Sequence, residues 1–131
     1  MGKLINKFRP YARIFLAVWI VLVIVLAILP DLPVPRIGGK QIPIRLDYPV
    51  HFLEHTLLAF LAIISFVTKQ TQKRTISFTL YSLILFALTV EFIQIFLPFR
   101  SFEFQELGFN IAGILIGTII ALLSIGEKKQ K

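Results

Sequence analysis

Polar and ionisable side chains in this sequence are concentrated near the ends of long apolar stretches. They are Asp47, His51, Glu54, His55, Glu91, Gln94, Arg100, Glu106 and Asn110. An ionisable group inside a lipid bilayer is costly unless it meets a partner or lines a water-filled pocket. We therefore expect these side chains, which come from three separate segments, to converge on a single polar pocket.

The residue types in this set suit acid–base chemistry or the binding of a polar headgroup. An imidazole beside a carboxylate can act as a general acid–base pair, which makes His51 and Glu91 candidate catalytic residues. The planar guanidinium of Arg100 suits a phosphate or a carboxylate. A lipid headgroup or a lipid-linked cell-wall precursor would fit a polar pocket just below the membrane surface. The sequence contains no serine-centred triad, phosphate loop or nucleotide motif, so whether the protein is an enzyme stays open.

A metal site is an alternative use of the same residues. His51 and His55 are four residues apart, the spacing that places two imidazoles on one helix face in helical metal sites. Glu91 would complete a set of two histidines and one carboxylate with an open position for water. Two histidines at this spacing are common by chance, so we assign no metal, and the sequence identifies no cofactor.

The composition predicts an integral membrane protein. Of the 131 residues, 56% are hydrophobic and only 16% are charged, and the mean hydropathy is +0.82. A soluble domain of this size would carry more charge and would break its apolar runs with polar faces. The net charge of +7 does not indicate nucleic-acid binding, because the Lys and Arg residues lie at the ends of apolar segments. The absence of cysteine excludes disulfides and thiolate metal sites.

The apolar runs predict an all-α membrane protein, a compact bundle of four transmembrane helices that forms a single domain over residues 1–131. A hydrocarbon core of about 30 Å requires roughly 20 apolar residues per helix. The predicted spans cover about 11–29, 50–67, 76–97 and 107–125. The loop at 30–49 contains five prolines and a Gly-Gly pair. We expect it to be irregular and to cover the outer mouth of the bundle.

The distribution of Lys and Arg predicts the orientation. Ten of the fourteen lie in the N-terminal tail, in the loop between the second and third spans, and in the C-terminal tail, and four lie on the opposite side. The positive-inside rule therefore places both termini in the cytoplasm and the polar pocket toward the outer surface. A cleaved signal peptide is an alternative for the first span. Its apolar core is long, however, and no cleavage site of the usual type precedes Pro30.

The polar residues of the second span share one helix face and also have structural interpretations. At about 100° per residue, Asp47, His51, Glu54, His55 and Leu58 fall within an arc of about 100°. Asp47 could serve as a helix cap ahead of Pro49, and the histidines could extend their polar tips to the headgroup region. Glu54 is the weakest site candidate, because a carboxylate near the interface can simply face water.

Glu91 is the most informative residue of the third span, because a carboxylate at that depth needs a cation, a hydrogen-bond donor or a proton. A structural alternative is a salt bridge from Glu91 to Arg100 or to a histidine. The amides of Gln94 and Asn110 could equally be interhelical hydrogen-bond partners.

The fourth span carries a stripe of Glu106, Asn110, Gly113 and Gly117 on one face. Two glycines four residues apart permit close approach between membrane helices. Packing within the chain is the main interpretation of Gly113 and Gly117, and a homodimer formed through them is an alternative.

Three motifs, taken in order, resemble the VanZ-like membrane proteins, a family named for a teicoplanin-resistance accessory factor. The motifs are Asp47-x-x-x-His51-Phe52-x-Glu54, then Glu91-x-x-Gln94, then Pro98-x-Arg100-x-Phe102 followed by an acidic residue, three spacers, Asn110, Gly113 and Gly117. The resemblance covers roughly residues 47–117. The sequence departs from the family at three positions. It has Tyr48 where the family often has Lys, His55 where an aromatic residue such as Tyr is usual, and Glu106 where the family usually has Asp.

The resemblance implies functional roles and a location. It implies catalytic roles for His51, Glu91 and Glu106, and substrate-binding roles for Asp47, Gln94, Arg100 and Asn110. It also implies a multi-pass protein of the bacterial plasma membrane that lowers susceptibility to glycopeptides of the teicoplanin type. It supplies no settled reaction.

Two functions of different classes follow from these observations. The first is an outward-facing pocket that binds or modifies an envelope lipid, through its phospholipid headgroup, or a lipid-linked cell-wall precursor. The alternative is a non-catalytic accessory protein whose polar residues lock the helices and whose outer loop docks a partner. Transport is a third possibility, but the predicted cytoplasmic halves of the spans are almost wholly apolar.

Overall fold

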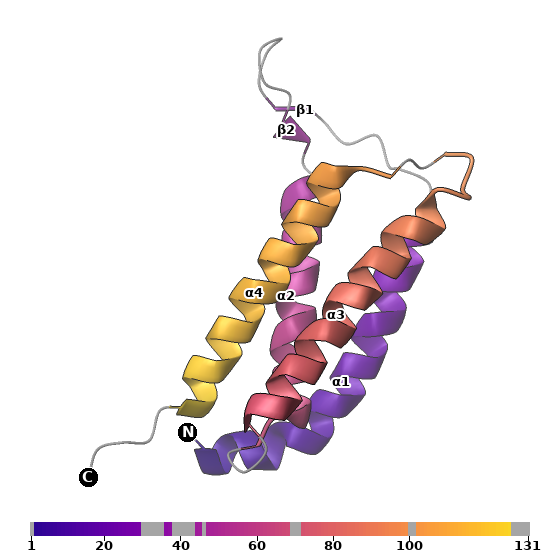
Figure 1. The fold of residues 1–131 in the computed structure, drawn as a ribbon. Coiled ribbons are helices and arrows are strands. Elements are labelled where there is room, and N and C mark those ends of the chain that lie inside the picture. Colours follow the sequence, from indigo (N-terminus) through magenta and orange to yellow (C-terminus); the bar gives the residue numbers. More distant parts are fainter. Residues whose placement is uncertain are drawn as a thin grey trace.

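Four long helices make up the computed structural model, which describes residues 2–29, 36–37, 44–45, 47–68, 72–99 and 102–126 (Figure 1). The helices are α1 (Gly2–Ile28), α2 (Asp47–Phe66), α3 (Gln72–Gln94) and α4 (Phe104–Gly126). Each contains a stretch that is long and apolar enough to cross a membrane. The predicted fold class, an all-α bundle of four membrane-spanning helices, is confirmed.

Helix α1 begins earlier than predicted, because the basic N-terminal segment continues the helix. Pro10 lies in its interior, and Figure 1 shows the first turns of α1 bent away from the direction of the rest. Proline lacks a backbone N–H and clashes with the preceding turn, which gives the bend an identifiable cause. The first turns therefore run across the end of the bundle, and the apolar part of α1 runs along it.

The loop predicted at 30–49 contains a short antiparallel pair of strands. β1 (Arg36–Ile37) and β2 (Ile44–Arg45) pair with Arg36 opposite Arg45 and Ile37 opposite Ile44. A β-branched residue in each strand favours this conformation. The expectation of an irregular loop is therefore modified at these four positions, and the other residues of 30–46 lie outside the described part of the chain.

The ends of α2 and α3 follow the local chemistry. α2 begins at Asp47 and has Pro49 in its first turn, where the missing N–H of proline leaves no helix bond unmade. α3 ends at Gln94, and the next turn tightens, because the amides of residues 95–97 each donate to the carbonyl three residues earlier, at 3.1–3.3 Å. Such winding is common at helix ends, and it stops the helix before Pro98.

Helices α2 and α4 form the closest pair in the bundle. A side chain at Gly113 would overlap the backbone oxygen of Phe52, and one at Gly117 would overlap the backbone oxygen of Thr56. Both glycines are buried. The structure therefore uses the glycine pair for packing within the chain and does not support its prediction as a homodimer interface.

Two arginines of α1 satisfy the end of α2. Nε and Nη2 of Arg9 donate to the carbonyls of Ile64 and Val67 at 3.2 and 2.9 Å, and Nε of Arg13 donates to the carbonyl of Ser65 at 3.5 Å. The last carbonyls of a helix have no partner within it, and a cation near that end also complements the helix dipole. These arginines therefore cap α2 in addition to biasing the topology.

Charged residues divide between the two ends of the bundle. The acidic residues of the described part lie where α2 and α4 begin and α3 ends, which we call the polar end; they are Asp47, Glu54, Glu91, Glu103 and Glu106. The lysines and arginines of the helices lie at the opposite end, which we call the basic end, and α1 starts and α4 finishes there (Figure 1). Which end faces the cytoplasm stays a prediction.

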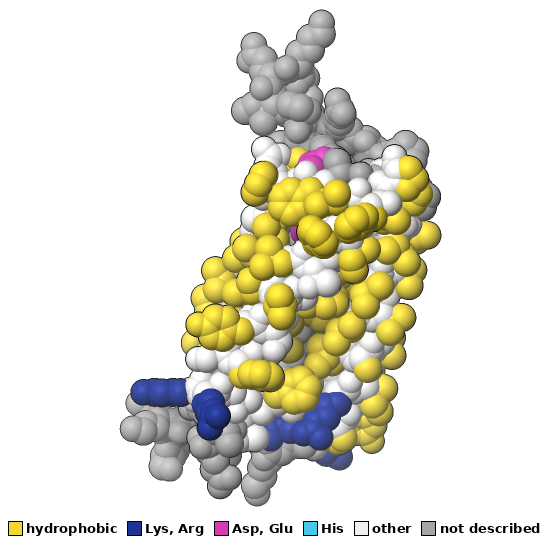
Figure 2. Space-filling view, turned by 45° about the vertical axis from the view of Figure 1, so that its right-hand side comes forward, with side chains coloured by type: hydrophobic (Ala, Val, Ile, Leu, Met, Phe, Trp, Pro, Cys, Tyr) yellow, Lys and Arg dark blue, Asp and Glu magenta, His cyan; other side chains and the backbone are white. Residues whose placement is uncertain are grey.

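The surface between the two ends is largely apolar. Figure 2 shows hydrophobic side chains over most of one face, with Lys and Arg gathered at its lower end. Phe15, Leu85 and Leu123 are among the large apolar side chains that are more than 60% exposed. In water such a surface would drive association, whereas within a bilayer it meets acyl chains. The apolar helices thus fit contact with the lipid bilayer.

Candidate functional site

Side chains from three helices meet near the polar end of the bundle. We call this group the polar cluster; it comprises His51, Glu54, His55, Glu91, Gln94, Glu106 and Asn110. Helix α2 supplies the first three, α3 the next two and α4 the last two. Most members are at least 98% buried, and none is more than 15% exposed. The expected convergence of polar residues from separate segments is thus observed for these seven.

His51 lies between two glutamates. Its Nδ1 is 3.6 Å from Oε2 of Glu54 on α2, and its Nε2 is 3.8 Å from Oε2 of Glu106 on α4. The His51 side chain is 14% exposed, whereas those of Glu54 and Glu106 are 9% and 3% exposed. Because each ring nitrogen faces a carboxylate, a proton on either nitrogen has an acceptor nearby, which suits general acid–base chemistry.

Glu91 and Asn110 join α3 to α4. Nδ2 of Asn110 donates to Oε1 of Glu91 at 2.9 Å, and both residues are 1% exposed. A hydrogen bond to an ionised carboxylate is stronger than a neutral one, so this contact both fixes the helices and supplies Glu91 with the donor that its depth requires. Glu106, which lies beside His51, is one turn before Asn110 on α4. The pair of Glu91 and Asn110 therefore adjoins the group formed by His51, Glu54 and Glu106.

His55 is oriented by its own helix. Its Nδ1 lies 3.0 Å from the carbonyl oxygen of His51. A carbonyl can only accept, so Nδ1 carries the proton, and in the neutral ring Nε2 is an acceptor. The predicted alternative of a metal held by His51, His55 and Glu91 gains no support, because the described residues contain no group of three potential ligands placed to hold a metal.

Gln94 ties the polar cluster to α1. Its Nε2 donates to the carbonyl of Ala27 at 3.2 Å, which is one of the terminal carbonyls of α1 that lack a partner within the helix. The side chain of Gln94 is 1% exposed. All four helices therefore contribute atoms to this end of the bundle.

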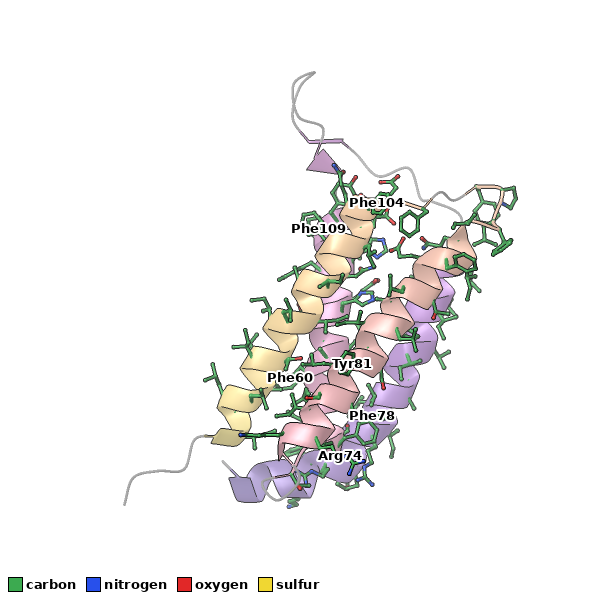
Figure 3. The ribbon with its side chains drawn as sticks, in the orientation of Figure 1. Phe60, Arg74, Phe78, Tyr81, Phe104 and Phe109 are labelled. Atoms are coloured by element: carbon green, nitrogen blue, oxygen red, sulfur yellow. The ribbon has the colours of Figure 1, made fainter. Side chains whose placement is uncertain are left out.

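The rim of the site is formed where α2 and α4 begin. Asp47 is half-buried at the start of α2, one turn above His51. Tyr48 stacks on Phe109 with ring centroids 5.3 Å apart (both helix starts are at the top of Figure 3, where Phe109 is labelled). The Tyr48 hydroxyl also lies 3.1 Å from Oε2 of Glu103. Arg100, predicted to bind substrate, lies outside the described residues.

Two residues of this region were given no site role from the sequence. Glu54, the weakest site candidate because a carboxylate near the interface can face water, is 8% exposed and lies beside His51. The spacing of three residues from His51 is a sequence signal that could have predicted this contact. Nε1 of Trp19 on α1 donates to the carbonyl of Glu54 at 3.0 Å. No sequence signal links Trp19 to α2, because the contact depends on how the two helices pack.

Hydrogen-bond acceptors exceed donors in the described part of the polar cluster. The amide nitrogens of Gln94 and Asn110 donate to the Ala27 carbonyl and to Glu91, respectively. Gln94 Oε1, Asn110 Oδ1 and His55 Nε2 are buried and meet no hydrogen-bond partner among the described residues. A buried acceptor without a donor is unfavourable by about 1–3 kcal/mol. The site is therefore suited to a ligand that brings N–H or O–H groups.

Comparison with known proteins identifies a family. The sequence model of the VanZ/LLP1 family matches residues 14–125, which is most of the chain and includes every member of the polar cluster. Searches of curated proteins and of solved structures give no match.

Proposed function

Because this chain belongs to the VanZ/LLP1 family, we propose that it binds or modifies the headgroup of an envelope lipid or of a lipid-linked cell-wall precursor. The observation that carries this proposal is the polar cluster, which is buried among helices that are otherwise apolar. A lipid-anchored molecule can present its headgroup to such a site by diffusing within the membrane.

The chemistry of the polar cluster favours a headgroup rich in donors. The acceptors Gln94 Oε1, Asn110 Oδ1 and His55 Nε2 have no donor among the described residues, and the neighbouring carboxylates add negative charge. Hydroxyl groups of a sugar or an ammonium group would satisfy these atoms. A lipid-linked sugar therefore fits the cluster better than a headgroup that offers acceptors only.

His51 is the residue we propose for proton transfer if the headgroup is modified. It is the most accessible member of its trio with Glu54 and Glu106, so it can reach a ligand while a carboxylate holds its other nitrogen. Glu91 and Glu106 have catalytic roles in this proposal, and Asp47, Gln94, Arg100 and Asn110 bind the ligand. The phenotype we propose is lower susceptibility to teicoplanin-type glycopeptides at the bacterial plasma membrane.

The first test compares Glu91→Gln and His51→Ala with the unmodified protein. Glutamine is isosteric with glutamate and can still accept the hydrogen bond from Asn110, so Glu91→Gln changes the charge and preserves the contact. Two quantities are measured: the melting temperature in detergent, and the teicoplanin susceptibility of bacterial cells that express each variant. A working site predicts an unchanged melting temperature with lost protection. Ser124→Ala, at a half-buried position near the far end of α4 and away from the polar cluster, is the control.

A second candidate is an accessory protein whose polar residues only lock the helices. Three interhelical hydrogen bonds favour it, from Asn110 to Glu91, from Gln94 to Ala27 and from Trp19 to Glu54. It predicts that protection falls in proportion to the melting temperature across both variants. Binding separates the two candidates further, because only a headgroup site predicts that a lipid-linked disaccharide raises the melting temperature of the unmodified protein and not of His51→Ala.

A further inference from the structure

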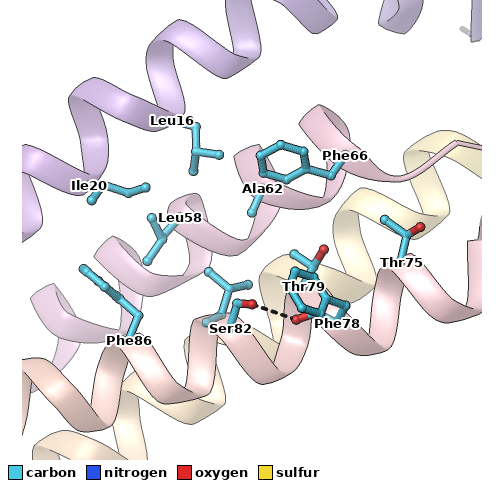
Figure 4. A pocket seen from close by; sticks show the side chains of 11 residues that line it. Leu16, Ile20, Leu58, Ala62, Phe66, Thr75, Phe78, Thr79, Ser82 and Phe86 are labelled. Carbon is cyan, nitrogen blue, oxygen red and sulfur yellow. Dashed lines mark hydrogen bonds between the residues drawn. The ribbon is translucent and has the colours of Figure 1, made fainter.

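An apolar groove lies between α1, α2 and α3, in the half of the bundle nearer the basic end. Its volume is about 470 Å³, which is within the range of roughly 300–1,000 Å³ for ligand pockets. Figure 4 shows the 11 side chains that line it, including Leu16 from α1, Leu58 and Ala62 from α2, and Phe78 and Ser82 from α3. We call this cavity the α3 groove.

The length of the α3 groove matches one leaflet of a bilayer. Its lining on α3 extends from Thr75 to Phe86, a rise of about 16 Å at ~1.5 Å per residue. Half of a hydrocarbon core is about 15 Å deep. The groove therefore covers the depth at which the acyl chains of the leaflet at the basic end lie.

The lining of the α3 groove favours a hydrocarbon chain over a polar ligand. Most of the lining side chains are aliphatic or aromatic. Among the polar ones, the Ser82 hydroxyl donates to the carbonyl of Phe78 at 2.9 Å (dashed line in Figure 4), so its proton is already used. A ligand that needed hydrogen bonds would find few here.

Basic side chains surround the end of the α3 groove. Lys73 and Arg74 directly precede Thr75 and are exposed, and Arg13 lies one turn before Leu16. Figure 3 labels Arg74 next to Phe78 at this end of α3. Every acidic residue in the described helices lies toward the polar end. The charge here therefore complements an anionic headgroup.

We propose that the α3 groove holds one acyl chain of an anionic glycerophospholipid whose phosphate lies against Lys73 and Arg74. This site is separate from the polar cluster, because it shares no lining residue with the cluster and the charged groups next to it lie at the opposite end of the bundle. The proposal does not depend on the function of the polar cluster. The bound lipid would fill the space between α3 and the rest of the bundle and so fix the position of the helix that carries Glu91 and Gln94.

The test uses the single tryptophan of the chain. Trp19 directly precedes Ile20, which lines the α3 groove, so a brominated acyl chain in the groove should quench its fluorescence. The protein is reconstituted into phosphatidylcholine vesicles that contain a minor fraction of brominated phosphatidylglycerol or, in parallel, the same fraction of brominated phosphatidylcholine. The expected result is much stronger quenching by the anionic lipid. Equal quenching by the two lipids would overturn the proposal.

Substitutions at the mouth test the headgroup contact. If Lys73 and Arg74 each contribute as a basic residue does at an anionic membrane surface, Lys73→Gln with Arg74→Gln lowers the preference for the anionic lipid roughly 30-fold. Lys7→Gln removes an exposed charge at the same end but outside the groove lining, and it should have little effect. An unchanged preference in the double variant would overturn the proposal.

A filled groove tests the chain contact. Ser82→Phe places a bulky ring in the α3 groove at an exposed position, and Ser77→Phe makes the same change at an exposed position of α3 outside it. Only Ser82→Phe should lower quenching by the anionic lipid, with both variants keeping the helical content of the unmodified protein. Equal effects of the two variants would contradict the proposal. So would loss of quenching in Glu91→Gln, which would assign the chain to a ligand of the polar cluster.

Discussion

The side-chain amide of Asn110 donates to the carboxylate of Glu91 at 2.9 Å, between two residues that are each 1% exposed. The two residues come from different helices and are 19 positions apart in the sequence. This contact links α3 to α4 within the buried polar cluster near the polar end of the bundle. It is both a structural bond and part of the proposed site, and the two roles can be separated by measurement.

A double-mutant cycle measures the structural role of this pair. Asn110→Leu should lower the free energy of unfolding by about 1–3 kcal/mol, because Oε1 of Glu91 loses its donor. The same change in a Glu91→Leu background should cost less, with a coupling of about 0.5–3 kcal/mol. Unfolding by denaturant in detergent gives these values. Ser124→Ala should be near neutral, because its hydroxyl donates to the carbonyl of Ile120 within α4. Strictly additive effects of the two substitutions would show that the contact between Asn110 and Glu91 does not stabilise the fold.

The same substitution at two glycines of α4, Gly117 and Gly108, should change the free energy of unfolding in opposite directions. Gly117→Ala should lower the free energy of unfolding by about 1–3 kcal/mol, because its Cβ would overlap backbone atoms of Thr56 that cannot move without parting the helices. Gly108→Ala meets no neighbour within 4 Å and should raise it by about 0.5–1 kcal/mol. Thermal unfolding of the two variants checks the sign of each change, and a stabilising Gly117→Ala would show that α2 and α4 do not approach this closely.

The capping of α2 predicts that one arginine of α1 matters more than its neighbouring lysine. Arg9→Gln removes a cation that donates to the carbonyls of Ile64 and Val67, and it should lower the free energy of unfolding by about 1.5–3 kcal/mol. Lys7→Gln, at an exposed position, should change it little. Hydrogen exchange of amides near the end of α2 gives a local readout, and equal exchange in both variants would argue against the cap.

The predicted orientation can be tested because the chain has no cysteine. Gly39→Cys, in the segment that the sequence predicts as the outer loop, should react with a membrane-impermeant maleimide added outside intact cells. Gly126→Cys, at the exposed end of α4, should react only after the membrane is permeabilised. The reverse pattern would place the polar cluster toward the cytoplasm and would exclude an outer-surface precursor as its ligand.

Apolar length alone predicted the four helices, because the thickness of the hydrocarbon core fixes the length of a spanning helix. The polar faces were predictable because residues about one helical turn apart lie on the same face, as do His51 and Glu54 on α2 and Glu106 and Asn110 on α4. Element ends were less predictable. The basic segment before Pro10 continues α1, since a proline near a helix end bends the chain without ending the helix.

The pairing of the faces could not be predicted from the sequence. Gly113 and Gly117 are compatible with a partner in the same chain or in another one, and only the packing of α4 against α2 decides between them. Glu54 was the weakest site candidate, because a carboxylate near the interface can face water, but neighbours on other helices cover it, including Trp19. Burial depends on how several helices pack together, and the residue pattern along one helix does not contain that information.

The separation of charge between the two ends of the bundle has an electrical consequence. The acidic groups at one end are partly offset by Arg36 and Arg45 of β1 and β2, whereas the lysines and arginines of α1 and α3 gather at the other end, so the molecule is a dipole along its long axis. A resting membrane potential acts on such a dipole with about 2.3 kcal/mol per elementary charge per 100 mV. Insertion with the basic end on the electrically negative side is therefore stabilised by the energised state of the membrane itself.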